Sequence, residues 1–68
     1  MKPQFTSLKQ IEALSQRFRS VPGGTYRVVG DHFEVLVQPV GGPEMRGTLP
    51  NTDEVRAFFD VNYWRAFP

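Results

Sequence analysis

Residues 25–38 read TYRVVGDHFEVLVQ, a pattern that is typical of a β-hairpin. Apolar and polar side chains alternate on both sides of Gly30-Asp31, a pair that suits a tight hairpin turn. Pairing Val29 with His32 across this turn places Arg27 opposite Glu34, so that opposite charges meet. One face of the predicted hairpin is apolar and consists of Tyr26, Val28, Phe33, Val35 and Val37. Pattern, turn and charge agree, and we therefore predict antiparallel strands over residues 25–29 and 32–38.

A helix is predicted on the N-terminal side of this hairpin. Ser7 and Gln10 have the spacing of a capping box, and Pro22 with the glycines after it ends the segment. Between these signals, apolar side chains recur at helical spacing, at Leu8, Ile11, Leu14 and Phe18.

On the C-terminal side, the sequence predicts a third strand and a second helix. Residues 39–43 read PVGGP and form a loop by composition, and residues 44–49 can form a strand. The second helix is expected to begin at Asn51 or Thr52, because the acidic residues that follow suit a helix N-terminus. The expected fold class is α+β, a single domain over residues 1–68 in the order α-β-β-β-α, with both helices packed on one face of a short antiparallel sheet.

The C-terminal residues 58–68 read FFDVNYWRAFP and hold five of the nine aromatic side chains. On a helical wheel Phe58 and Phe59 face the core, Tyr63 lies at its margin, and Trp64 falls almost opposite. Either the helix continues and Trp64 is exposed, or the helix stops near Asn62 and the residues after it fold back. Large apolar side chains outside a small core usually mark a partner surface. We predict a partner-binding set of Val61, Trp64, Arg65 and Phe67.

The charge is nearly balanced but unevenly distributed. Eight Lys and Arg against seven Asp and Glu give a net charge of +1, far from that of a strongly basic nucleic-acid-binding protein. The first 21 residues nevertheless carry four basic residues against Glu12 alone. A possible nucleic-acid-binding set is therefore Lys2, Lys9, Arg17 and Arg19, to which Arg27 and Arg46 could be added.

The predicted order of elements is similar to that of double-stranded-RNA-binding domains and resembles that of the small HicA-type toxins, which cleave RNA with a histidine on a strand. Gly30-Asp31-His32 would fall where the toxin family has Gly-Ser-His. This resemblance implies RNA binding, or RNA cleavage centred on His32. The second helix of a double-stranded-RNA-binding domain begins with lysines, whereas this chain reads Thr52-Asp53-Glu54, and acidic residues there would repel phosphates.

The sequence offers little for catalysis. His32 is the only histidine and cysteine is absent, so a zinc site would need several carboxylates, and the acidic residues match no calcium-loop spacing. The serines show no nucleophile-elbow pattern, and the glycine pairs are not followed by the residues of a phosphate loop. We predict no catalytic residue, no metal site and no cofactor.

These observations favour a small non-catalytic protein-interaction module that binds through its aromatic C-terminal helix. Such a module could be an inhibitor, an adaptor or an assembly component of a larger complex, and a homodimer through the second helix is the simplest version. An RNA-binding domain that uses the basic first helix is the alternative. Residues 1–5, MKPQF, lack the apolar stretch of a signal peptide, so we expect a cytoplasmic protein without membrane contact.

Overall fold

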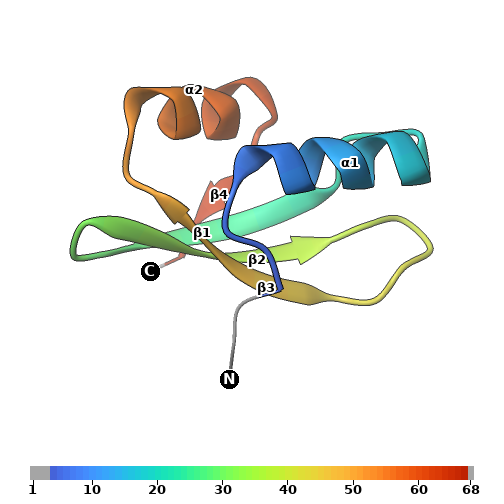
Figure 1. Cartoon of the computed structure of the whole chain (residues 1–68), viewed down its shortest axis with the longest axis horizontal. Coiled ribbons are helices and arrows are strands. Elements are labelled where there is room, and N and C mark those ends of the chain that lie inside the picture. Colours follow the sequence, from blue (N-terminus) through green and yellow to red (C-terminus); the bar gives the residue numbers. More distant parts are fainter. Residues whose placement is uncertain (1–3, 68) are drawn as a thin grey trace.

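A computed structural model describes residues 4–67 (Figure 1). Two helices lie on one side of a four-stranded sheet whose strand order is β3-β2-β1-β4. The elements are α1 (Leu8–Phe18), β1 (Gly23–Val29), β2 (His32–Gln38), β3 (Met45–Pro50), α2 (Asp53–Val61) and β4 (Arg65–Ala66). The predicted α+β class and the order α-β-β-β-α are confirmed. The short β4 was not predicted, and because it pairs in parallel with β1 the sheet is mixed instead of purely antiparallel.

The central hairpin has the predicted register. Val29 pairs with His32 across the turn, and Arg27 pairs with Glu34. Gly30 has a φ of 62°, a left-handed conformation that glycine adopts without strain and that a tight hairpin turn requires. On β3, Gly47 and Leu49 face the core, as the alternation of that strand predicts.

Both helices begin with the caps that the sequence indicates. The Gln10 Oε1 accepts a hydrogen bond from the backbone N–H of Ser7 at 3.1 Å, which is half of a capping box. In α2, the Thr52 hydroxyl accepts one from the N–H of Val55 at 3.3 Å. The first helix ends at Phe18, and its C-terminal cap, Arg19, has a left-handed φ of 58°. These caps set where each helix starts along the sheet.

The core lies between the helices and the sheet and is rich in aromatic rings. Phe59 of α2 stacks on Tyr26 of β1 with centroids 4.1 Å apart, and it meets Phe33 of β2 edge to face at 5.1 Å. Such pairs add about 0.5–1.5 kcal/mol each beyond their buried area. The buried hydrophobic side chains that form this core are Phe5, Ile11, Phe33, Val35, Val37, Leu49, Val55, Phe59 and Trp64.

The N-terminal segment covers the outer edge of β3. The N–H of Gln4 donates to the carbonyl of Arg46 at 2.8 Å, and the N–H of Thr48 donates to the carbonyl of Phe5 at 3.0 Å. The last residue of the strand, Pro50, has no N–H to offer. An exposed row of unpaired backbone groups is a template for aggregation, so this arrangement protects one edge of the sheet.

Candidate binding surface

The C-terminal segment folds back onto the sheet, which is the second of the two alternatives that the sequence left open. Helix α2 ends at Val61, and the N–H of Trp64 donates to the carbonyl of Phe59 at 3.0 Å. The Trp64 ring then packs on Phe59, with centroids 5.2 Å apart, and is 6% exposed. The interpretation of Trp64 as a surplus side chain for a partner is therefore wrong, because its own chain covers it. The wheel misplaced it because the helix does not reach residue 64.

Tyr63 makes this reversal possible. Its φ of 57° is left-handed, and its side chain is 89% exposed instead of lying at the margin of the core. This is the position after the helix cap at which glycine is usual, because a Cβ is unfavourable there.

We expect the substitution Tyr63→Gly to stabilise the protein. It removes the unfavourable left-handed Tyr conformation and loses little buried area, so the free energy of unfolding should rise by about 0.5–1 kcal/mol. Urea denaturation followed by circular dichroism measures the change. A lower stability than that of the unsubstituted chain would mean that the tyrosine ring contributes more than its exposure indicates.

The face of the sheet opposite the helices carries no covering layer within residues 4–67, and we call it the uncovered face (Figure 1). The strand register arranges its side chains in rows across the sheet. One row, of Pro50, His32 and Val29, lies next to the hairpin turn, and two others, the first and second rows, lie further from it. The first row consists of Arg46, Leu36, Thr25 and Arg65. The second row consists of Thr48, Glu34 and Arg27, and continuing the register by one place adds Phe67, whose N–H donates to the carbonyl of Tyr26 at 2.7 Å.

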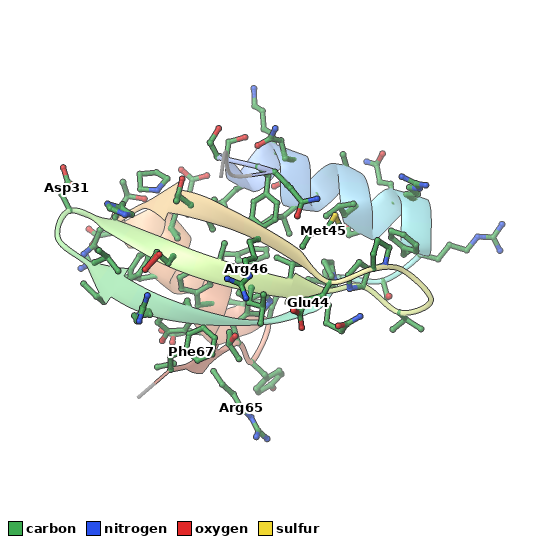
Figure 2. All side chains as sticks on the ribbon, turned by 90° about the horizontal axis from the view of Figure 1, so that it is seen from below. Asp31, Glu44, Met45, Arg46, Arg65 and Phe67 are labelled. Atoms are coloured by element: carbon green, nitrogen blue, oxygen red, sulfur yellow. The ribbon has the colours of Figure 1, made fainter. Side chains whose placement is uncertain are left out.

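A shallow groove of about 320 Å³ lies on the uncovered face. Leu36 and Phe67 provide its apolar surface, and Arg27 and Arg46 provide its positive charge. Figure 2 looks onto this face, with Arg46 over the middle of the sheet and Phe67 and Arg65 on the side of β4. Both Arg65 and Phe67 belong to the predicted partner-binding set. Phe67 lines this groove, which the sequence did not indicate, whereas Arg65 does not line it and its side chain points away from the sheet beyond β4 (Figure 2).

The arginines of the uncovered face differ in their partners. Arg27 is paired with Glu34 through a charge-assisted hydrogen bond. Among residues 4–67, neither Arg46 nor Arg65 has a salt bridge. The face therefore presents two positive charges that no neighbouring carboxylate of the described chain neutralises by direct contact.

The fourth member of the predicted partner-binding set, Val61, lies elsewhere. It is 73% exposed at the end of α2, in the helical layer. Since the groove lies on the face of the sheet opposite the helices, Val61 and the groove cannot form one flat contact surface. The predicted set is thus divided between the core (Trp64), the helical layer (Val61) and the C-terminal strand (Arg65 and Phe67).

The structure divides the predicted nucleic-acid-binding residues between α1 and the uncovered face. Lys9 and Arg17 lie near opposite ends of α1, about 12 Å apart along the helix axis. Arg19 follows as the left-handed helix cap, and Lys2 lies outside the described residues. The possible additions Arg27 and Arg46 are on the uncovered face, with the sheet between them and α1.

His32 lies at the tip of the hairpin and not in the groove. Its Nδ1 is 3.4 Å from the Oδ1 of Asp31, and this carboxylate is fully exposed. Within residues 4–67, no group of three or more His, Cys, Asp or Glu side chains has the arrangement of a metal site. A helix long and apolar enough to cross a membrane is also absent from this part of the chain.

Comparison with known proteins identifies no relative: no family model, no curated protein and no solved structure matches this chain. The resemblance to double-stranded-RNA-binding domains and HicA-type toxins is therefore limited to the order of the elements and, for the toxins, to Gly30-Asp31-His32.

Proposed function

We propose that this chain is a non-catalytic module that binds a protein partner through the uncovered face of its sheet, as an inhibitor, adaptor or assembly component of a larger complex. The observation that carries the proposal is the groove between Leu36, Arg46 and Phe67 on a sheet face with no covering layer among the described residues. An apolar floor with arginine at its margin is the composition of many protein interfaces. The absence of cysteine from the sequence favours a cytoplasmic setting.

The sequence predicted a binding surface on α2, whereas the proposed binding surface lies on the sheet. The reason is Trp64, which was the main support for a contact through the helix and is 6% exposed. Phe67 is 42% exposed and lines the groove, so it replaces Trp64 as the aromatic contact. Of the predicted partner-binding set, only Val61 remains on α2 to support homodimerisation through that helix.

Affinity capture of the tagged protein from its native cell tests the proposal. We expect a specific partner that is lost with Phe67→Ser and retained with Val61→Ser, since the first change alters the groove and the second alters only the helical layer. Circular dichroism of both variants checks that they fold. A partner that is lost with Val61→Ser but retained with Phe67→Ser would return the interface to α2 and overturn the proposal.

RNA binding is the second candidate function, favoured by the arginines that flank the groove. Its test is fluorescence anisotropy with single-stranded and duplex RNA at low salt, where binding that weakens with added salt is the expected signature.

A further inference from the structure

The first row of the uncovered face has a positive charge at each end. Arg46 and Arg65 lie on the outer strands, and Leu36 and Thr25 lie between them on β2 and β1. Neighbouring strands are roughly 4.8 Å apart, so the backbone positions of the two arginines are separated by about 14 Å. Because neither has a salt bridge within residues 4–67, both guanidinium groups are available to carboxylates.

An extended peptide matches this spacing. It rises by roughly 3.3 Å per residue, so residues four positions apart span about 13 Å and point to the same side. Carboxylates at positions i and i+4 would therefore lie over the backbone positions of Arg46 and Arg65, and the Arg65 side chain, which points away from the sheet in Figure 2, would turn toward the second carboxylate. The side chain at i+2 would lie between Leu36 and Thr25 and beside the groove, where an apolar group can contact Leu36 and leave water.

The same face is less suited to a nucleic acid. Glu34 lies in the second row and lines the groove, where its carboxylate would repel a phosphate backbone, which carries charge along its whole length. A peptide along the first row would carry its carboxylates only at the two ends, away from Glu34. Phe67 is the only aromatic residue of the two rows, whereas sequence-tolerant binding of single strands uses successive aromatic rings. Two separate arginines with an apolar centre favour a peptide over a polyanion.

We infer that the partner contributes an extended acidic segment, with carboxylates at i and i+4 and an apolar side chain at i+2, which crosses the uncovered face from Arg46 to Arg65. This inference rests on the proposed function and specifies the chemistry of the partner. The segment runs across the strands and is bound by side chains, so it does not require an unpaired sheet edge.

Fluorescence anisotropy with synthetic peptides tests the inference on the full chain. The probe is a labelled peptide with two glutamates four positions apart and a leucine midway, in a glycine and serine frame. The control peptide has the same composition with the glutamates adjacent. We expect the spaced peptide to bind about fivefold more tightly, and binding to weaken as salt is raised.

Variants of the protein test the contact. Arg46→Ala and Arg65→Ala should each weaken binding of the spaced peptide by about three- to fivefold, the effect of one exposed ion pair. Lys9→Ala and Arg17→Ala remove the same charge from the helical layer and should leave binding unchanged. Equal binding of the two peptides, equal losses in all four variants, or tighter binding of a labelled single-stranded RNA that also depends on Arg46 and Arg65 would overturn the inference.

The two proposals can fail separately. If capture from the cell depends on Phe67 while the spaced peptide does not bind, the protein-binding function stands and the acidic segment is wrong. If neither Phe67 nor the two arginines affect any binding, both are wrong.

Discussion

Replacing Trp64 with alanine is expected to lower the free energy of unfolding by about 3–5 kcal/mol, as for other large side chains removed from a core. The ring is 6% exposed and packs on Phe58 and Phe59, with centroids 5.4 and 5.2 Å away. A chain of 68 residues has a total stability of only roughly 3–10 kcal/mol, so much of the variant should be unfolded at room temperature. Urea denaturation followed by circular dichroism measures the loss.

Two further variants make this prediction specific. Val61→Ala removes an apolar side chain that is 73% exposed and should change the stability by less than about 0.5 kcal/mol. Trp64→Phe keeps an aromatic ring, and it breaks no hydrogen bond of the described chain because the buried Nε1 of Trp64 has no partner there. The decrease in the free energy of unfolding for Trp64→Phe should therefore be much smaller than that for Trp64→Ala. A Trp64→Ala variant as stable as Val61→Ala would contradict the fold of the C-terminal segment.

The packing of Trp64 against β1 can also be tested at Gly24. A Cβ at this position would lie 2.7 Å from ring atoms of Trp64, closer than real contacts allow. Gly24→Ala should therefore destabilise the protein by about 1–3 kcal/mol when Trp64 is present and by much less when it is replaced by alanine. Such non-additivity, measured in a double-mutant cycle, reports direct contact between the two positions.

The hairpin could be predicted because every signal for it is local. The alternation of side chains, the Gly30-Asp31 turn and the Arg27–Glu34 pair all lie within residues 25–38, and each gives the same register. The caps at Ser7 and Thr52 are local in the same way. What these patterns cannot give is a contact between distant parts of the chain, such as the pairing of β4 with β1.

Trp64 was misplaced for a physical reason. A helical wheel assumes that the helix continues, and the reversal at Tyr63 depends on a left-handed residue that is not glycine. Tyrosine carries no sequence signal for that conformation, and the resulting strand is only two residues long. Phe5 is a similar case, since its burial depends on hydrogen bonds to β3 and on no periodic pattern.

Part of the candidate surface could be predicted from the sequence. The alternation that sends Phe33, Val35 and Val37 to the core also sends Glu34 and Leu36 to the other face. The sequence also predicted both helices on one face of the sheet, which leaves this second face without a covering layer in the described chain. It did not show that the C-terminal segment forms β4 at the edge of the sheet. The groove follows from that layering, because Phe67 reaches the face only through β4.

Gly47→Ala is expected to have the next largest effect, a loss of about 2–4 kcal/mol in the free energy of unfolding. A Cβ at position 47 would lie 2.5 Å from the carbonyl oxygen of Phe5 and 2.5 Å from its ring. The backbone of this segment cannot move aside easily, because Phe5 accepts from the N–H of Thr48 and Gln4 donates to Arg46. Gly23→Ala is the matched control, since a Cβ there meets nothing within 4 Å.

Hydrogen exchange of the Gly47→Ala variant should also show which contact is lost when the stability falls. If the added methyl group displaces the N-terminal segment, the amide of Thr48 loses its acceptor and should exchange with deuterium faster than the amides of the central hairpin. The outer edge of β3 then has unpaired groups at Arg46 and Thr48, so the variant should associate at high protein concentration in sedimentation experiments. A monomeric variant with a protected Thr48 amide and unchanged stability would mean that residues 4–5 do not hold this edge, and the burial of Phe5 would have to be revised.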